Sequence, residues 1–269
     1  MLNSLISNKS AEKILFYLLL NSRCYATQLS QRLETPLTPL QHALQKLEEG
    51  GVLLSHSEGK TRHFEFNPNY PLLHELESLL KKAYTYLPVQ QKKLFYSPQF
   101  SNSPHKHRSS HAGPLTSQTV IFSLWQKLRE IKTMSFCAKS KSVSPSGWNG
   151  IGKGQVEVKS QDEKTLVFHE RGSWNSEENK RFDFSNIFRW ILKAEDGVIT
   201  LEHLRFGAQN PVFLFSLVPI DAHTLESLDA HICNQDSYFG QIRCDKHFVQ
   251  FNWRSIGPKK NEEIDYLYT

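Results

Sequence analysis

Apolar and polar positions follow different periods in the two halves of the chain. Up to residue 86, apolar residues recur every three or four positions, as on one face of an α-helix. The clearest stripe consists of Leu40, Ala43, Leu44 and Leu47, with Gln, His and Lys between them. After residue 132, short segments of strand-forming residues alternate with turn residues. We therefore predict an α+β protein with a helical front half and a β-rich back half.

The front half predicts four helices, over residues 11–20, 26–33, 38–49 and 72–86. Ser10 is placed to cap the first helix, which carries an apolar run on an amphipathic pattern. Thr38 is placed to cap the third helix, so that Pro39 takes the first helical position, where its missing N–H costs little. Gly50 and Gly51 end this helix.

A short hairpin is expected after the third helix. One strand begins at residue 52, and the other returns over residues 63–66. The turn at 57–62 carries two cations, Lys60 and Arg62. Helix, turn, helix and hairpin in this order form a winged helix-turn-helix, a module that places one helix in a DNA groove.

The stretch Gly-Gly-Val-Leu-Leu, turn, Lys-Thr-Arg-His-Phe-Glu-Phe-Asn-Pro resembles bacterial winged-helix regulators of the ArsR and MarR type. The resemblance covers residues 8–85 and implies a third helix in the major groove of double-stranded DNA, with the hairpin touching the backbone or the minor groove. It assigns DNA contacts to Thr38, Gln41, His42, Gln45, Lys60 and Arg62. The alternative is that these residues form a surface for protein contacts.

The predicted helix at 72–86 leaves two interpretations open. In many such regulators this helix dimerises, and a homodimer would bind a palindrome. Alternatively, the helix packs on its own domain.

Residues 97–116 are rich in Ser, Pro and His and nearly free of large apolar residues, so they cannot build a core. We expect a winged-helix domain at 1–95, a flexible linker at 96–116 and a barrel domain at 117–269. The linker residues His105, His107 and His111 would form a metal or phosphate site, or have no function.

The charge is divided unevenly along the chain. Residues 1–116 hold 13 Lys or Arg and 8 Asp or Glu, whereas the remaining residues hold 19 of each. The net charge of +5 therefore lies in the front half and the linker. This favours a polyanionic partner such as DNA, although an ordinary solvated surface would look the same.

The back half predicts a helix at 120–131 and then eight or nine strands. The strands are expected at 133–140, 154–160, 165–171, 182–193, 198–206, 212–217, 225–233, 238–244 and 248–256. Their number and spacing indicate an antiparallel barrel, closed or nearly closed, with room for one small ligand. Four tryptophans are expected to fill or line it: Trp148, Trp174, Trp190 and Trp253.

Five phrases carry a second resemblance: GWNGIGKG at 147–154, FHERGSW at 168–174, LEHLRFG at 201–207, HICNQDSY at 231–238 and WRSIGPKK at 253–260. They resemble an uncharacterised bacterial domain family with a lipocalin-like, calycin-type barrel, over residues 118–269. The resemblance implies the fold and supplies no activity. The Gly-rich phrase is not a nucleotide loop, because no Lys-Ser or Lys-Thr follows at the required spacing.

A ligand site is expected inside the barrel. Alternation along residues 201–206 places His203 and Arg205 on one strand face, and a buried Arg needs an anionic partner. The predicted ligand-binding residues are His203, Arg205, His231, Tyr238 and Trp253. The expected ligand is small and partly apolar, and an anionic group on it would suit the arginine.

Other interpretations of these residues remain open. Arg205 would pair with Glu170 or Asp236, or simply face solvent. A metal at His203, His231 and Cys233 rests only on the weak His-x-Cys motif. Catalysis by Cys233 or His203 would need an ordered nucleophile–base pair. We expect no metal and no cofactor.

No run approaches the ~18 apolar residues of a membrane span, and the N-terminus lacks a signal-peptide pattern. Four scattered cysteines favour free thiols in a reducing compartment, so we expect a cytoplasmic protein without membrane contact. The predicted function is a DNA-binding transcription regulator whose barrel senses a small molecule. One alternative is a small-molecule-processing enzyme with the winged helix for targeting or oligomerisation. The other is an interaction protein.

Overall fold

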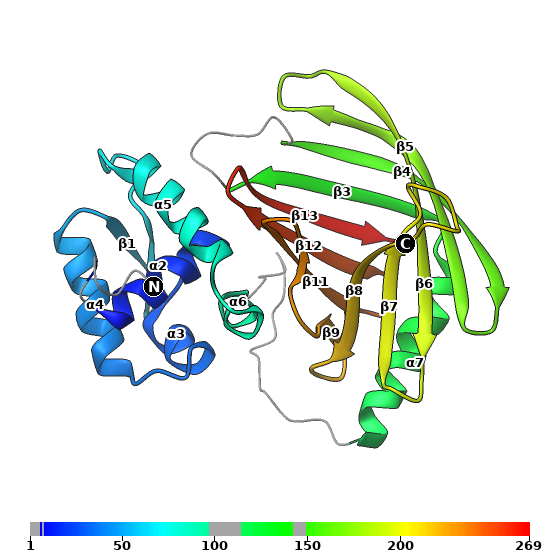
Figure 1. Ribbon diagram of the computed structural model, residues 1–269, viewed down its shortest axis with the longest axis horizontal. Helices are drawn as coiled ribbons and strands as arrows, with labels where there is room; N and C mark the ends of the chain where they lie inside the picture. Colours follow the sequence, from blue (N-terminus) through cyan, green and yellow to red (C-terminus); the bar gives the residue numbers. More distant parts are fainter. Residues whose placement is uncertain (1–5, 7, 97–113, 142–148) are drawn as a thin grey trace.

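The computed structural model describes residues 6, 8–96, 114–141 and 149–269 of the chain. A helical part formed by the front half lies against a closed antiparallel β-barrel formed by the back half (Figure 1). The predicted α+β class and the predicted barrel are therefore confirmed. Within the described ranges, no helix is both long enough and apolar enough to cross a membrane.

The described front half contains, in order, α2 (Lys9–Leu20), α3 (Ala26–Arg32), α4 (Leu37–Glu49), β1 (Leu53–Glu58), β2 (Thr61–Phe66), α5 (Leu73–Thr85) and α6 (Val89–Phe95). The four predicted helices are present within two residues of their expected ends, whereas α6 is not predicted by the pattern. The N-caps of two helices differ from the prediction, because α4 follows Pro36 and Thr38 lies inside it, and because Asn8 and not Ser10 is the N-cap of α2. The side-chain oxygen of Asn8 accepts hydrogen bonds from the backbone N–H groups of Ser10 and Ala11 at 2.9 and 3.1 Å.

The back half contains α7 (Pro114–Glu130), β3 (Thr133–Ser140), β4 (Gly150–Asp162), β5 (Thr165–Ser176), β6 (Arg181–Lys193), β7 (Val198–His203), β8 (Val212–Pro219), β9 (Thr224–Ser227), β10 (His231–Cys233), β11 (Asp236–Cys244), β12 (Val249–Gly257) and β13 (Lys260–Tyr268). Ten of these strands form the ring β11-β12-β13-β3-β4-β5-β6-β7-β8-β9, which closes where β9 pairs with β11. Strand β10 pairs with β11 beside the ring. The pattern misses β13 and merges β9 and β10 into one segment.

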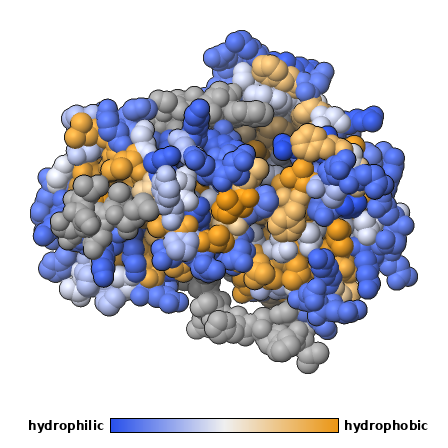
Figure 2. Space-filling model, in the orientation of Figure 1, coloured by the Kyte–Doolittle hydropathy of each residue, from blue (hydrophilic) through white to orange (hydrophobic). Residues whose placement is uncertain are grey.

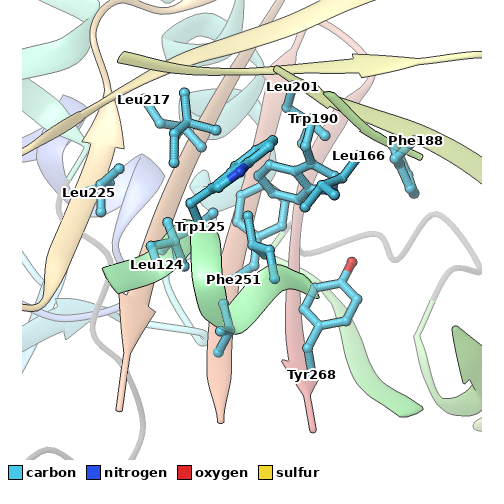
Figure 3. Close-up of a cluster of buried hydrophobic side chains, with 14 of the residues drawn as sticks. Leu124, Trp125, Leu166, Phe188, Trp190, Leu201, Leu217, Leu225, Phe251 and Tyr268 are labelled. Carbon is cyan, nitrogen blue, oxygen red and sulfur yellow. The ribbon is translucent and has the colours of Figure 1, made fainter. Parts of the chain in front are cut away.

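Helix α7 closes one end of the barrel. Leu124 and Trp125 extend from it toward Trp190 and Leu217 in the barrel core (Figure 3). The indole N–H of Trp125 donates a hydrogen bond at 3.2 Å to the carbonyl oxygen of Glu163, in the turn between β4 and β5. Each large apolar side chain buried in this way contributes about 1.5–3 kcal/mol, so the helix is an integral part of the barrel.

Helix α2 is buried on every side. Nine of its twelve residues are buried, although its sequence pattern predicts one exposed face. Helices α4, α5 and α6 pack against α2, and the barrel adds to the cover, because Ala230, Phe239 and Ile256 belong to the same apolar cluster as α2. A helix that is apolar all round is stable in water only when every side is covered. The front half and the barrel therefore share one core.

Arg254 on β12 joins the two parts. Its side chain is buried, and its guanidinium donates five hydrogen bonds. The acceptors are the carbonyl oxygens of Leu20 (2.9 Å), Leu19 (3.2 Å), Ser255 (3.1 Å) and Glu262 (2.7 Å) and the side-chain oxygen of Asn261. A guanidinium has five N–H donors, so all are used. Because Leu19 and Leu20 end α2, their carbonyls lack intrahelical partners, and Arg254 caps the helix from the barrel.

Helix α6 and the residue that follows it extend this interface. The Tyr96 hydroxyl donates to the side-chain oxygen of Asn252 at 2.9 Å, and the Tyr96 ring stacks on Phe239 with centroids 4.8 Å apart. Lys92 Nζ donates to Ser237 Oγ at 3.2 Å. These contacts correct the ends of the predicted linker at 96–116: Tyr96 is buried in the interface, and α7 begins at residue 114. The remaining linker residues, including His105, His107 and His111, lie outside the described residues.

Replacing Arg254 with Met should uncouple the two parts. The substitution leaves the carbonyl of Leu20 and the side-chain oxygen of Asn261 without their donor, and it leaves the carbonyl of Leu19 with Asn261 Nδ2 alone. We therefore expect the free energy of unfolding to fall by about 3 kcal/mol. Urea denaturation followed by tryptophan fluorescence measures this loss. The matched control is Arg205→Met, on an exposed arginine, which should change stability by less than about 0.5 kcal/mol. Equal, small losses in both variants would show that Arg254 does not hold the interface.

Candidate functional site

The outer face of α4 and the tip of the β1–β2 hairpin are open to solvent. All six residues with predicted DNA contacts are exposed: Thr38, Gln41, His42, Gln45, Lys60 and Arg62. Helix α4 lies at the end of the molecule away from the barrel, so the barrel does not cover this face (Figure 1). The structure thus brings the polar positions of α4 and the hairpin to one side of the front half.

Two of these six side chains are held by neighbours. Arg62 pairs with Glu48 at 2.6 Å and donates from Nε to Ser55 Oγ at 2.9 Å. Gln45 donates to Glu49 at 2.8 Å. A phosphate would therefore compete with Glu48 for Arg62. Lys60, in the two-residue turn beside Gly59, is the cation best placed to meet a phosphate without such competition.

An ionic cluster at the hairpin was not found by sequence reasoning. Glu58 contacts Arg23 at 2.8 Å, His56 at 3.3 Å and His63 at 3.5 Å. The hydrogen bond from His56, followed by the nearby cations, lowers the pKa of Glu58. Burial lowers the pKa of His63, which favours a neutral imidazole. The pairing of His56 with His63 across the hairpin could have indicated this cluster, but it can be recognised only when the strand register is known.

Four of the five predicted ligand residues meet in an aromatic cluster inside the barrel. The ring of His203 stacks on Phe188 (4.8 Å between centroids), Phe188 contacts Trp253 (6.4 Å), Trp253 contacts Tyr238 (6.4 Å) and Tyr238 contacts His231 (6.0 Å). We call these five residues the mouth cluster. In the space-filling view, apolar surface gathers on the barrel below the lobe formed by the hairpin of β5 and β6 (Figure 2). The structure therefore assembles an aromatic surface from residues on β6, β7, β10, β11 and β12.

Arg205 does not join the mouth cluster. Strand β7 ends at His203, so the alternation predicted for residues 201–206 stops before Arg205. Arg205 is exposed, and its guanidinium lies over the ring of Phe206, 4.6 Å from the centroid. The expectation that His203 and Arg205 share an inward face is therefore corrected: Arg205 faces solvent and does not pair with Glu170 or Asp236.

The mouth cluster is less cationic than predicted. Burial lowers the pKa of His203, with a smaller contribution from Arg205, and burial also lowers the pKa of His231. Both imidazoles are therefore neutral at neutral pH. The cation at this position is Lys260, which pairs with Asp236 at 2.8 Å and donates to the Tyr238 hydroxyl at 2.6 Å. Burial opposes its charge, but these hydrogen bonds outweigh burial and raise the pKa of Lys260.

A buried carboxyl group lies deeper in the barrel. Glu170 on β5 is fully buried, and its Oε1 accepts a hydrogen bond from the Tyr268 hydroxyl at 2.8 Å. Within the described part of the chain, its other oxygen has no hydrogen-bond partner. Burial raises the pKa of Glu170 to about 7, although the side chains of Tyr268 and Asn186 favour the charged form. Sequence reasoning placed Glu170 only as a partner for Arg205 and missed this environment.

The space between the mouth cluster and α7 is tightly packed. Phe188, Trp190, Leu201, Phe251, Trp253, Tyr266 and Tyr268 enclose a space with no room for a water molecule. A ligand must therefore lie at the mouth cluster or displace these side chains. Among the described residues, no three His, Cys, Asp or Glu side chains are grouped in a way that could hold a metal ion. Cys233 in particular does not form such a group with His203 and His231.

Comparison with known proteins gives one match. Residues 124–269, which comprise the C-terminal part of α7 and all the barrel strands, match a family of unknown function, DUF6314. No curated protein matches the chain. The match covers the barrel predicted from the second resemblance and brings no activity with it.

Glu170 should make the stability of the barrel depend on pH. Its pKa is about 7 in the folded chain and about 4.3 when unfolded, so the folded state holds the proton more tightly. The resulting stabilisation is complete below the unfolded pKa and is lost as the pH rises through the folded pKa. As the pH rises from the unfolded pKa to the folded pKa of Glu170, the free energy of unfolding of the parent should fall by about 3 kcal/mol relative to that of Glu170→Gln.

Urea denaturation at a series of pH values tests this prediction. Glu157→Gln, on an exposed carboxylate of the neighbouring strand, is the matched control and should run parallel to the parent. A difference between parent and Glu170→Gln that stays constant with pH would contradict the raised pKa.

Proposed function

The chain belongs to the DUF6314 family, whose function is unknown, and we propose that it is a DNA-binding regulator controlled by a small molecule. In this proposal α2, α3, α4 and the β1–β2 hairpin form a winged helix-turn-helix. The barrel is the sensor, and the mouth cluster is the ligand site. The observation that carries the proposal is the direct connection between the mouth cluster and α2 through two adjacent residues of β12.

The DNA-binding part of the proposal is supported by the exposed face of α4. Gln41, His42 and Gln45 are polar and exposed to solvent, and glutamine side chains can read adenine edges in the major groove. Lys60 at the hairpin tip would neutralise a phosphate. Glu48 holds Arg62 in the free protein, so this arginine would reach the DNA only if the ion pair opens.

The sensing part of the proposal is supported by the alternation of β12. Successive residues of a strand point to opposite faces, and Trp253 points into the mouth cluster while Arg254 points outward and caps α2. Helix α2 in turn packs against α4. A ligand that moves Trp253 would shift β12 and, through Arg254, the helix that supports α4. Such a ligand regulates only if it favours one of two arrangements of these helices.

The mouth cluster favours a small, partly apolar ligand. Aromatic rings provide most of the surface, and two neutral histidines and the Tyr238 hydroxyl provide hydrogen-bonding groups. The charge of Lys260 is already balanced by Asp236, which weakens the case for an anionic ligand.

A barrel enzyme is the second candidate, and one observation favours it. A carboxyl group with a pKa of about 7, such as Glu170, is suited to general acid–base catalysis near neutral pH. Glu170 is fully buried, however, and the space lined by its partner Tyr268 admits no water, so a substrate would have to open the core.

Binding to duplex DNA tests the leading proposal directly. We expect the full chain to bind a mixed-sequence duplex with an affinity that falls as salt rises, because phosphate contacts release counterions. Lys60→Ala should weaken binding and reduce the slope of log affinity against log salt by about 1. Fluorescence anisotropy at several salt concentrations measures both quantities.

The matched control is Lys159→Ala, which removes an exposed lysine from the barrel and should bind as the parent does. Two results would refute the DNA-binding proposal: no salt-dependent binding by the parent, or equal losses for Lys60→Ala and Lys159→Ala.

A further inference from the structure

The outer wall of the barrel carries a groove that the proposed function does not use. The groove has a volume of about 740 Å³ and crosses β3, β4, β5 and β6 beside the end of β13. Volumes of this size are typical of small-molecule sites. The side chains of the mouth cluster do not line it, so the two sites are distinct.

Three cations line this groove. Lys153 on β4, Arg171 on β5 and Arg181 on β6 are exposed, and none of their side chains has an ion pair or hydrogen bond with another described residue. Ser135, Ser173 and Gln155 add neutral hydrogen-bond donors. Asp183 is the one acidic side chain among the lining residues. The groove therefore presents a surplus of positive charge and of hydrogen-bond donors.

The floor of the groove is formed by glycine backbone. Gly154 and Gly172 are cross-strand partners on β4 and β5. A Cβ atom on Gly172 would lie 2.2 Å from the carbonyl oxygen of Lys153, and one on Gly154 would lie 2.4 Å from the carbonyl oxygen of Arg171. Only glycine fits this close approach of the two strands. The two strands therefore lie close together at this point of the groove, beside Lys153 and Arg171.

We propose that this groove binds a small molecule that carries a diphosphate or two phosphate groups. Guanidinium groups match the geometry of phosphate oxygens through paired N–H donors, and Lys153 supplies a point charge beside them. Several cations with one opposing carboxylate suit a ligand with more than one negative charge. A nucleic acid is a poorer fit, because a recess bordered by Asp183 suits a compact ligand better than a long polyanion.

Isothermal titration calorimetry of the full chain with inorganic pyrophosphate at low salt tests this proposal. We expect one site per chain in the parent. The double variant Arg171→Gln with Arg181→Gln should bind at least about tenfold more weakly, because each lost charged hydrogen bond is worth more than the 1.4 kcal/mol of a tenfold change. Thermal unfolding without ligand checks that the variant is folded.

The matched control is the double variant Lys159→Gln with Lys180→Gln, which removes two exposed charges whose partners lie outside the groove. It should bind pyrophosphate within about twofold of the parent, as should Lys60→Ala at the hairpin. The proposal fails if the parent does not bind pyrophosphate, or if the control loses as much affinity as the groove variant. It also fails if the groove variant loses affinity for duplex DNA but not for pyrophosphate, since the groove would then be a nucleic-acid surface.

Discussion

The buried guanidinium of Arg254 is the constraint on which the arrangement of this chain depends. All five of its N–H donors are used, and two of the acceptors are the last carbonyls of α2, which no residue of the helix can satisfy. Burial lowers the pKa of Arg254, with the nearby carboxylate of Glu263 acting in the opposite direction. The charge faces the negative end of the helix dipole, which partly replaces the hydration that it has lost. Without the barrel, or without the helix, the other part would expose apolar interface residues and lose these hydrogen bonds.

This connection explains two features that would otherwise conflict. Helix α2 is apolar on all sides after its first turn, which is unstable for a helix at the surface of a small separate domain, and the outer wall of the barrel completes the cover that α4, α5 and α6 provide. In the proposed regulator, β12 connects the two halves directly, so the chain between them need not transmit strain. Trp253 and Arg254 are neighbours in sequence, yet one contacts the mouth cluster and the other contacts α2. The mouth cluster, which is the proposed sensor site, and α2 are thus separated by the thickness of one strand.

Local patterns predicted the helices and most strands, but not the contacts between the halves. Strand β3 has the predicted bounds, because its strand-forming residues form one continuous segment after the end of α7. Strand β13 was missed because its outward residues Asn261, Glu263 and Asp265 are polar, which is typical of a loop. Their partners are Leu19, Lys141 and Asn252, which only the tertiary structure brings beside them. Arg254 was unremarked for the same reason: an arginine on the outer face of a strand normally faces solvent. Arg205 was misplaced because a strand end depends on tertiary pairing. The polar face of α4, by contrast, could be identified from the helical spacing of its apolar residues alone.

Hydrogen–deuterium exchange of the Trp253→Leu variant tests most directly whether the mouth cluster is coupled to the front half. Trp125→Leu, at the opposite end of the barrel, is the control for general loosening of the core. The account predicts faster exchange in α2 and α4 for Trp253→Leu and not for Trp125→Leu, because only the first lies beside Arg254 on β12. Faster exchange confined to barrel strands in both variants would contradict it. The barrel and the front half would then be in contact, but a change at the mouth cluster would not affect the front half.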